Sequence, residues 1–148
     1  MNVSSGLVTA RRGPLRERCL PYAHQSVEEA DIEAVVRTLR SEWLTTGPAV
    51  EQFEAEVAAC VGARHAVAFS SGTAALHGAV AAAGAGPGDE GITTPLTFCS
   101  TANCLLFQGA RPVFADVEDS TLTIDPEAVK RRITRKTKVV ISVDYGGH

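Results

Sequence analysis

Ser71, Gly72 and Thr73 have the types and the spacing to bind a phosphate group. They follow a short apolar run, His65 to Phe69, and precede an alanine-rich segment that favours a helix. The first N–H groups of a helix lack partners and lie at the positive end of its dipole, so they attract an anion. Glycine also lets the backbone approach a ligand closely. Serine and threonine are equally common helix caps, and local chemistry leaves both readings open.

Other kinds of site find less support. The P-loop pattern is absent, and Gly84, Gly86 and Gly88 follow a helical segment instead of a strand, which argues against NTPase and dinucleotide folds. The histidines lack metal-ligand spacing, and Ser71 is not in a G-x-S-x-G elbow. Phe98 follows a predicted strand, where an aromatic ring suits either the core or stacking on a flat ligand.

Composition narrows the class of protein further. The chain has 148 residues, 14 basic and 17 acidic, and a net charge of −3, so no nucleic-acid partner is expected. Its most apolar stretch, 74–85, is too short and too weakly hydrophobic for a membrane span. Four cysteines without a C-x-x-C pair predict a reduced, cytoplasmic protein. Residues 1–20 lack a secretory pattern and are predicted to form a flexible tail, with one domain over 21–148.

Helix signals recur along the chain. Ser26 and Glu29 predict a capping box at the start of a helix of about 14 residues. A second helix is expected from Pro48 to Gly62, with glutamates on a solvated face. Asp125 and Pro126 predict the start of another. The expected apolar faces of the first two helices are Ile32, Val35, Val36 and Leu39, then Val50, Phe53 and Val57; the expected solvated glutamates are Glu51, Glu54 and Glu56.

Short apolar runs alternate with these helices. The expected strands are His65–Phe69, Ile92–Thr94, Val113–Val117 and Lys138–Asp144, with a helix at Ser100–Gln108 between the second and third. Such alternation predicts an α/β fold, a mostly parallel sheet with helices on both faces. A chain that stops just after a strand is expected to leave apolar surface uncovered, as the front part of a larger fold would.

The order and spacing of several motifs resemble the DegT/DnrJ/EryC1/StrS sugar aminotransferases over about residues 20 to 148. The matching runs are Trp43–Pro48, Ser71–His77, Gly86–Glu90, Thr94–Phe98, Ala102–Asn103, Gly109–Asp116, Ile124–Pro126 and Lys136–Lys138. The ending Ser142–Gly147, with Ala102–Cys104, is similar to the transaminases of pseudaminic acid biosynthesis, which aminate a UDP-linked 4-keto-6-deoxy-N-acetylhexosamine.

This resemblance implies a type I aminotransferase fold that uses pyridoxal 5'-phosphate (PLP), with active sites at a homodimer interface and glutamate as the amino donor. It implies that the amides of Gly72 and Thr73 hold the cofactor phosphate and that Phe98 stacks on the cofactor ring. The residues implied to face the sugar nucleotide are Tyr22, Trp43, Leu44, Thr45 and Ser71.

The sequence departs from the family in three respects. Ser70 stands where asparagine is common, and Gly91 stands where a strand former is usual, which is expected to weaken that strand. Relatives are more than twice as long, and their Schiff-base lysine lies in a segment beyond this chain. The only lysines, Lys130, Lys136 and Lys138, are expected in a solvated helix end and turn. No catalytic residue is therefore assigned.

Two hypotheses follow from these observations. The first is the N-terminal part of the PLP-binding domain of a nucleotide-sugar aminotransferase, inactive as this chain alone because the lysine is missing. The second is a non-catalytic module that pairs with a complete subunit or with a separately encoded C-terminal half.

Overall fold

A three-stranded parallel sheet forms the centre of the residues that the computed structural model describes, 23–148. The order is β2-β1-β3, with β1 (Glu90–Thr93) between β2 (Arg111–Phe114) and β3 (Thr137–Val140). Ile92 pairs with Val113 on one side and with Val140 on the other. All four residues of β1 are buried, as expected for a central parallel strand. The chain forms two compact units, one ending at Gly47 and the other running Pro48–His148.

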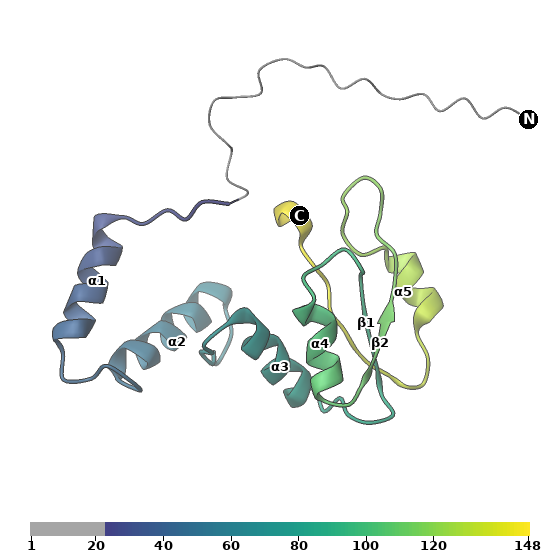
Figure 1. Ribbon diagram of the computed structural model, residues 1–148, viewed down its shortest axis with the longest axis horizontal. Coiled ribbons are helices and arrows are strands. Elements are labelled where there is room, and N and C mark those ends of the chain that lie inside the picture. The colour runs from purple at the N-terminus through teal and green to yellow at the C-terminus, as the bar shows by residue number, and fades with distance from the viewer. Residues whose placement is uncertain (1–22) are drawn as a thin grey trace, which may run out of the picture. The chain divides into compact units, whose positions relative to one another are not determined.

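Helices cover both faces of this sheet, which confirms the predicted α/β architecture (Figure 1). On one face α3 (Gly72–Ala82) packs on α4 (Ser100–Phe107), and on the other lies α5 (Pro126–Arg132). The buried residues of the first face are Val80, Ala85, Cys104, Leu105 and Ala110. Those of the second are Ile92, Ala115 and Ala128.

Gly91 is part of β1, and its missing side chain makes room for Leu105 of α4. A Cβ built on Gly91 collides with both methyl groups of Leu105. Leu105 is fully buried, so α4 approaches the sheet closely only because this position is glycine. The pairing with β3 shifts register between Glu90 and Gly91.

The predicted first strand, His65–Phe69, is wrong. This segment pairs with no strand among the described residues, and Val67 and Phe69 are exposed. A strand requires a hydrogen-bonded neighbour, and an apolar pattern alone does not supply one. The other three strands form, with bounds shifted towards the N-terminus; Pro112 lies within β2, which is an edge strand and so tolerates proline.

The predicted N-terminal helices form, but with differences. The helix α1 (Glu29–Arg40) begins after Glu28, and the Asp31 carboxylate accepts a 2.8 Å hydrogen bond from the Glu28 N–H. The capping box predicted at Ser26 and Glu29 is therefore wrong, because the N-cap is Glu28 and the capping box joins it to Asp31. The predicted apolar face of α1 is not buried: Ile32, Val35 and Leu39 are exposed.

The second helix, α2 (Pro48–Val61), has the predicted bounds and ends at Gly62, which has a φ of +67°. Its predicted burial of Val50 and Phe53 is wrong, since both are exposed and the only buried residue of the helix is Ala58. Apolar periodicity identifies a helix face but does not say that another element covers it.

The start of α5 is confirmed in detail. The Asp125 carboxylate caps the helix by accepting a 2.8 Å hydrogen bond from the Glu127 N–H, and Pro126 occupies the first helical position. Over residues 23–148, none of the helices has the length and apolar character needed to cross a membrane.

Glu90 links the beginning of β1 to the beginning of β2 and to the segment that precedes β3, and it gives the fold a dependence on pH. Its carboxylate, with only 6% of the side chain exposed, accepts from the Arg111 guanidinium at 2.6 Å and from the Thr134 hydroxyl at 2.8 Å. The Arg111 hydrogen bond, followed by that from Thr134, holds the pKa of Glu90 below its ordinary value of 4.5.

We expect Glu90→Gln to lower the urea midpoint of unfolding near neutral pH. A carboxyl whose pKa is lower in the folded state stabilises the fold above its unfolded pKa, and this contribution is lost as the pH falls through the folded value. The difference between wild type and Glu90→Gln should therefore shrink below about pH 4.5. Glu127→Gln, which removes an exposed partner of Lys130, is the control. A difference that stays constant from neutral to acid pH would contradict this role.

Candidate functional site

The N-terminus of α3 presents two backbone N–H groups that the protein itself does not use. Ser71 is the N-cap; its hydroxyl accepts from the Ala74 N–H at 3.2 Å and its carbonyl from the Ala75 N–H at 3.0 Å. The N–H groups of Gly72 and Thr73 donate to no acceptor within 23–148. A Cβ on Gly72 would meet no atom within 4 Å, so the space in front of this turn is open. The turn can therefore receive an anion.

The two readings of this turn are compatible. Ser71 caps the helix, as expected for a serine at this position. It accepts hydrogen bonds from the third and fourth N–H groups of α3, those of Ala74 and Ala75, and leaves the first two without a partner in the described residues. The Thr73 hydroxyl also has no hydrogen-bond partner among the residues described, and its side chain is half-buried. Two amides and one hydroxyl thus remain for the oxygens of a phosphate.

Phe98 lies in the segment that joins β1 to α4, and the backbone of that segment is held in place. The Leu96 N–H donates to the hydroxyl of Thr94, a fully buried residue, at 3.2 Å. The Thr101 N–H donates to the carbonyl of Phe98 at 3.0 Å, in the first turn of α4. Phe98 itself is 73% exposed, so its ring is not a core residue. An exposed aromatic ring on a fixed backbone suits stacking on a flat ligand.

The turn at the start of α3 and Phe98 lie at the same edge of the sheet. Short segments connect α3 to the beginning of β1 and the end of β1 to α4, so both helices run antiparallel to this strand. Their N-termini therefore lie at its carboxyl end, where open α/β sheets bind their ligands. The two helices pack together, with Val80 in the same buried cluster as Cys104 and Leu105.

The residues expected to face a sugar nucleotide do not all belong to the unit that contains Gly72, Thr73 and Phe98. Trp43, Leu44 and Thr45 are exposed in the loop after α1 and belong to the first unit. The Trp43 N–H donates to the Ser41 hydroxyl at 3.2 Å. Tyr22 lies outside the described residues. Ser71 is at the turn, but its hydroxyl is engaged in the helix cap.

The structural role of one residue near the site was not predicted from the sequence. Glu54 of α2 was expected on a solvated face, but it is half-buried and its carboxylate accepts a 2.7 Å hydrogen bond from the Ala68 N–H. Ala68 lies four residues before Gly72, so this contact fixes the segment that leads into the turn. No local sequence pattern predicts this hydrogen bond, because its two partners are 14 residues apart and are brought together by the tertiary fold.

The remaining polar groups offer no second site. Lys130, Lys136 and Lys138 are exposed, and Lys138 lies in β3, which overlaps the predicted strand Lys138–Asp144. Cys60 and Cys99 are exposed free thiols, and burial raises the pKa of the Cys104 thiol. Cys19 lies in the part that is not described. Residues 23–148 contain no group of three His, Cys, Asp or Glu side chains suited to a metal ion.

The fold is that of the PLP-dependent aminotransferases. The structure superimposes on Spr1654 from Streptococcus pneumoniae, described as a sugar aminotransferase, with a TM-score of 0.81 and 35% identity. That match covers 86% of this chain and 32% of the other. Spr1654 has been solved in PLP and PMP forms, and PLP is the cofactor of such enzymes. The free amides and the exposed ring described above fit a phosphate and an aromatic cofactor.

The chain belongs to the DegT/DnrJ/EryC1/StrS aminotransferase family, which matches residues 25–148. It is 52% identical over 132 residues to the spore coat polysaccharide biosynthesis protein SpsC of Bacillus subtilis, covering 89% of this chain and 34% of SpsC. PseC of Helicobacter pylori, an aminotransferase of pseudaminic acid biosynthesis, superimposes with a TM-score of 0.78 and 35% identity, covering 86% of this chain and 34% of PseC. The chain thus spans about a third of the length of these relatives.

Proposed function

We propose that this chain is the N-terminal part of the PLP-binding domain of an aminotransferase that acts on a nucleotide-linked sugar. In the complete protein, an amino group passes from glutamate to the keto carbon of a UDP-linked 4-keto-6-deoxy-sugar. The single observation that carries the proposal is the turn at the start of α3, where the N–H groups of Gly72 and Thr73 have no acceptor within residues 23–148 and a Cβ on Gly72 would meet no atom within 4 Å.

The residues of this chain would bind and orient the cofactor. The Gly72 and Thr73 amides would hold its phosphate, with the Thr73 hydroxyl as a further donor, and the helix dipole would favour the negative charge. Phe98 would stack on its ring and keep water from that face. When bound, PLP supplies an electron sink for the bonds at the amino-bearing carbon. None of the lysines of this chain lies on the elements that hold Gly72, Thr73 and Phe98.

Relatives support the proposed substrates. The UDP-4-amino-4-deoxy-L-arabinose–oxoglutarate aminotransferase of Shewanella sediminis is 43% identical over 128 residues, covering 86% of this chain and 33% of that protein. Its name gives a UDP-linked 4-amino sugar and oxoglutarate, the keto acid of glutamate. PseC supports a sugar of the pseudaminic acid type. We further propose that Tyr22 and Trp43–Thr45 contact the sugar nucleotide, and that the complete protein is a cytoplasmic homodimer.

The open edge of β3 favours a second candidate, a module whose main role is pairing. Within the described residues, β3 pairs with β1 alone, and its other edge is free to bind a strand. Beside it, a groove of about 310 Å³ between α3 and β3 is lined by Leu76, Val80, Val139 and Ile141 among others. A polypeptide that carries further strands of the family fold could cover this surface.

A chimera tests the two candidates. In it, residues 21–148 replace the matching third of the Shewanella sediminis enzyme, and the unmodified enzyme is the control. We expect the chimera to bind PLP and to transfer the amino group of UDP-4-amino-4-deoxy-L-arabinose to oxoglutarate; a UDP-linked 4-keto-6-deoxy-sugar with glutamate then tests the proposed substrate. A folded chimera that binds no PLP would refute the aminotransferase proposal. Stable assembly with PLP bound but no transfer would favour the pairing module.

A further inference from the structure

The segment that leads into the phosphate-binding turn has no regular secondary structure. Residues 65–69 pair with no strand in the part of the chain that the structure describes. A segment without strand partners would leave the position of the following turn poorly fixed, because its backbone N–H and carbonyl groups have no ladder. Two contacts within the second unit nevertheless hold it.

The first contact is made by the Glu54 carboxylate. Its Oε1 accepts a 2.7 Å hydrogen bond from the Ala68 N–H, and the group is half-buried. A hydrogen bond to an ionised carboxylate is shorter and stronger than one between neutral groups. The bond therefore ties the backbone of Ala68 to the middle of α2, a 14-residue helix.

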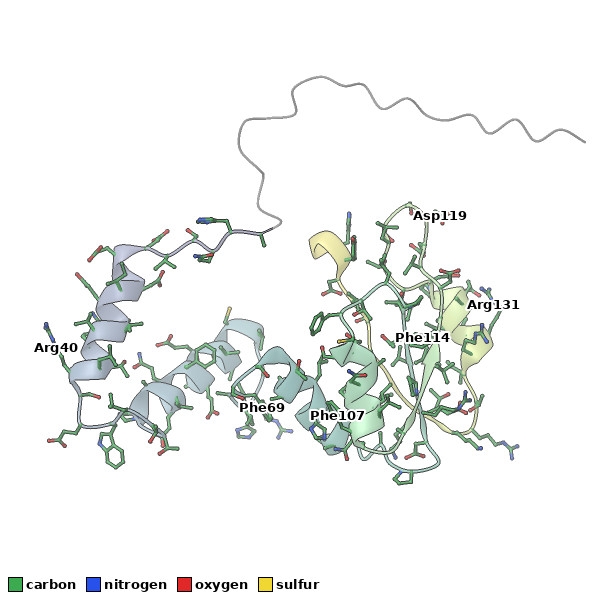
Figure 2. All side chains as sticks on the ribbon, viewed as in Figure 1. Arg40, Phe69, Phe107, Phe114, Asp119 and Arg131 are labelled. Carbon is green, nitrogen blue, oxygen red and sulfur yellow. The ribbon has the colours of Figure 1, made fainter. Side chains whose placement is uncertain are left out.

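The second contact is made one residue further along, by Phe69. Its ring lies against Gly78 of α3, and a Cβ built at Gly78 would come within 2.5 Å of the ring carbon Cζ and 2.9 Å of Cε1. Figure 2 labels Phe69 beside α3. The missing side chain at Gly78 is thus what allows the ring to seat on the helix. Ala68 and Phe69 are held from two different helices, and Gly72 follows three residues after Phe69.

We propose that Glu54 is a positioning residue for the phosphate-binding turn. It anchors Ala68 while Phe69 is seated on Gly78, and together they hold the Ser71–Thr73 backbone so that the free N–H groups of Gly72 and Thr73 keep a fixed direction. Small displacements of groups that orient a ligand have large effects on binding, so an anchor this near the turn matters. The positioning role of Glu54 does not depend on the proposed function. Only the expected effect of Glu54 on cofactor affinity rests on the proposed function.

The test compares three variants of the 148-residue chain by NMR. Glu54→Ala removes the acceptor, and Glu54→Gln keeps an acceptor oxygen without the charge. Glu56→Ala is the matched control on the same helix, because the Glu56 carboxylate accepts a hydrogen bond from the exposed side chain of Gln52. The readouts are hydrogen exchange at the Ala68 amide and the order parameters of the Gly72 and Thr73 amides. A fourth variant, Gly78→Ala, displaces Phe69 with Glu54 intact.

In Glu54→Ala we expect the Ala68 amide to exchange about tenfold faster, and the order parameters of Gly72 and Thr73 to fall from about 0.85 towards 0.6. Glu54→Gln should recover most of both changes, Gly78→Ala should lower the same order parameters, and Glu56→Ala should change neither. Unchanged order parameters in Glu54→Ala would overturn the proposal, even if the Ala68 amide loses protection. Should Glu54→Ala not fold, Glu54→Leu, which also lacks an acceptor for the Ala68 N–H, takes its place, and unchanged order parameters at Gly72 and Thr73 in that variant would likewise overturn the proposal.

A titration with PLP separates this inference from the proposed function. If the turn binds the cofactor phosphate, Glu54→Ala should weaken PLP binding about threefold to tenfold, and Glu54→Gln should weaken it less. If the order parameters change as expected but wild type binds no PLP, the phosphate-binding function is wrong and the positioning role of Glu54 stands. If wild type binds PLP and Glu54→Ala binds it equally well, the positioning role has no consequence for the site and is rejected.

Discussion

Replacing Gly91 with alanine is expected to lower the free energy of unfolding by about 1–3 kcal/mol, the usual cost of inserting a methyl group into a packed core. The new Cβ collides with both methyl groups of Leu105, which is fully buried and cannot move outward into solvent. Because Leu105 holds α4 against the sheet, the cost falls on the contact that positions the segment carrying Phe98. Urea unfolding of the 148-residue chain measures it.

The same site gives a sharper result in a double-mutant cycle. Leu105→Ala alone should cost about 2–5 kcal/mol, because it leaves a cavity beneath α4. In the double variant, the methyl group added at residue 91 enters the space that the leucine vacated, so the combined loss should be clearly smaller than the sum. Gly72→Ala, where a Cβ meets no atom within 4 Å, is the control for glycine replacement as such. Strict additivity at residues 91 and 105 would show that the two side chains do not compete for space.

The parts of the fold that depend on local signals could be predicted from the sequence. Asp125 and Pro126 start α5 because a cap and an N1 proline act on neighbouring backbone groups. Gly62 ends α2 for an equally local reason, its positive φ. The segment 65–69 could not be predicted, because whether an apolar run becomes a strand depends on a hydrogen-bonding partner elsewhere in the chain.

The candidate site shows the same division. Gly72 and Thr73 could be proposed from the sequence because an apolar run, a small turn and a helix start are contiguous in it. Their N–H groups have no acceptor within residues 23–148, and their role in binding stays a prediction. Glu54 was predicted to be exposed to solvent, because a glutamate on an amphipathic helix usually lies on its solvated face. Gly91 was expected to weaken its strand, because the sequence does not show that Leu105 occupies the space beside it.

If the turn at the start of α3 binds the cofactor phosphate as proposed, one substitution there should have opposite effects on stability and on binding. Gly72→Asp places a carboxylate at the first position of α3, where the space is open and the helix dipole favours a negative charge. The free energy of unfolding should rise by about 0.3–1 kcal/mol. The same carboxylate repels a phosphate at the free amides, so PLP binding should weaken by roughly tenfold to a hundredfold.

Two comparisons make this result specific to charge. Gly72→Asn has nearly the same shape without the charge, so it should weaken PLP binding much less than Gly72→Asp. Pyridoxal, which lacks the phosphate, should bind to Gly72→Asp with about the same affinity as it binds to the wild-type chain. PLP affinities followed by absorbance and unfolding followed by circular dichroism provide the measurements. Only a phosphate within reach of residue 72 would respond to the charge placed there. If Gly72→Asn and Gly72→Asp weaken PLP binding equally, or if pyridoxal binding is weakened as much as PLP binding, the turn does not bind the phosphate and serves only to cap α3.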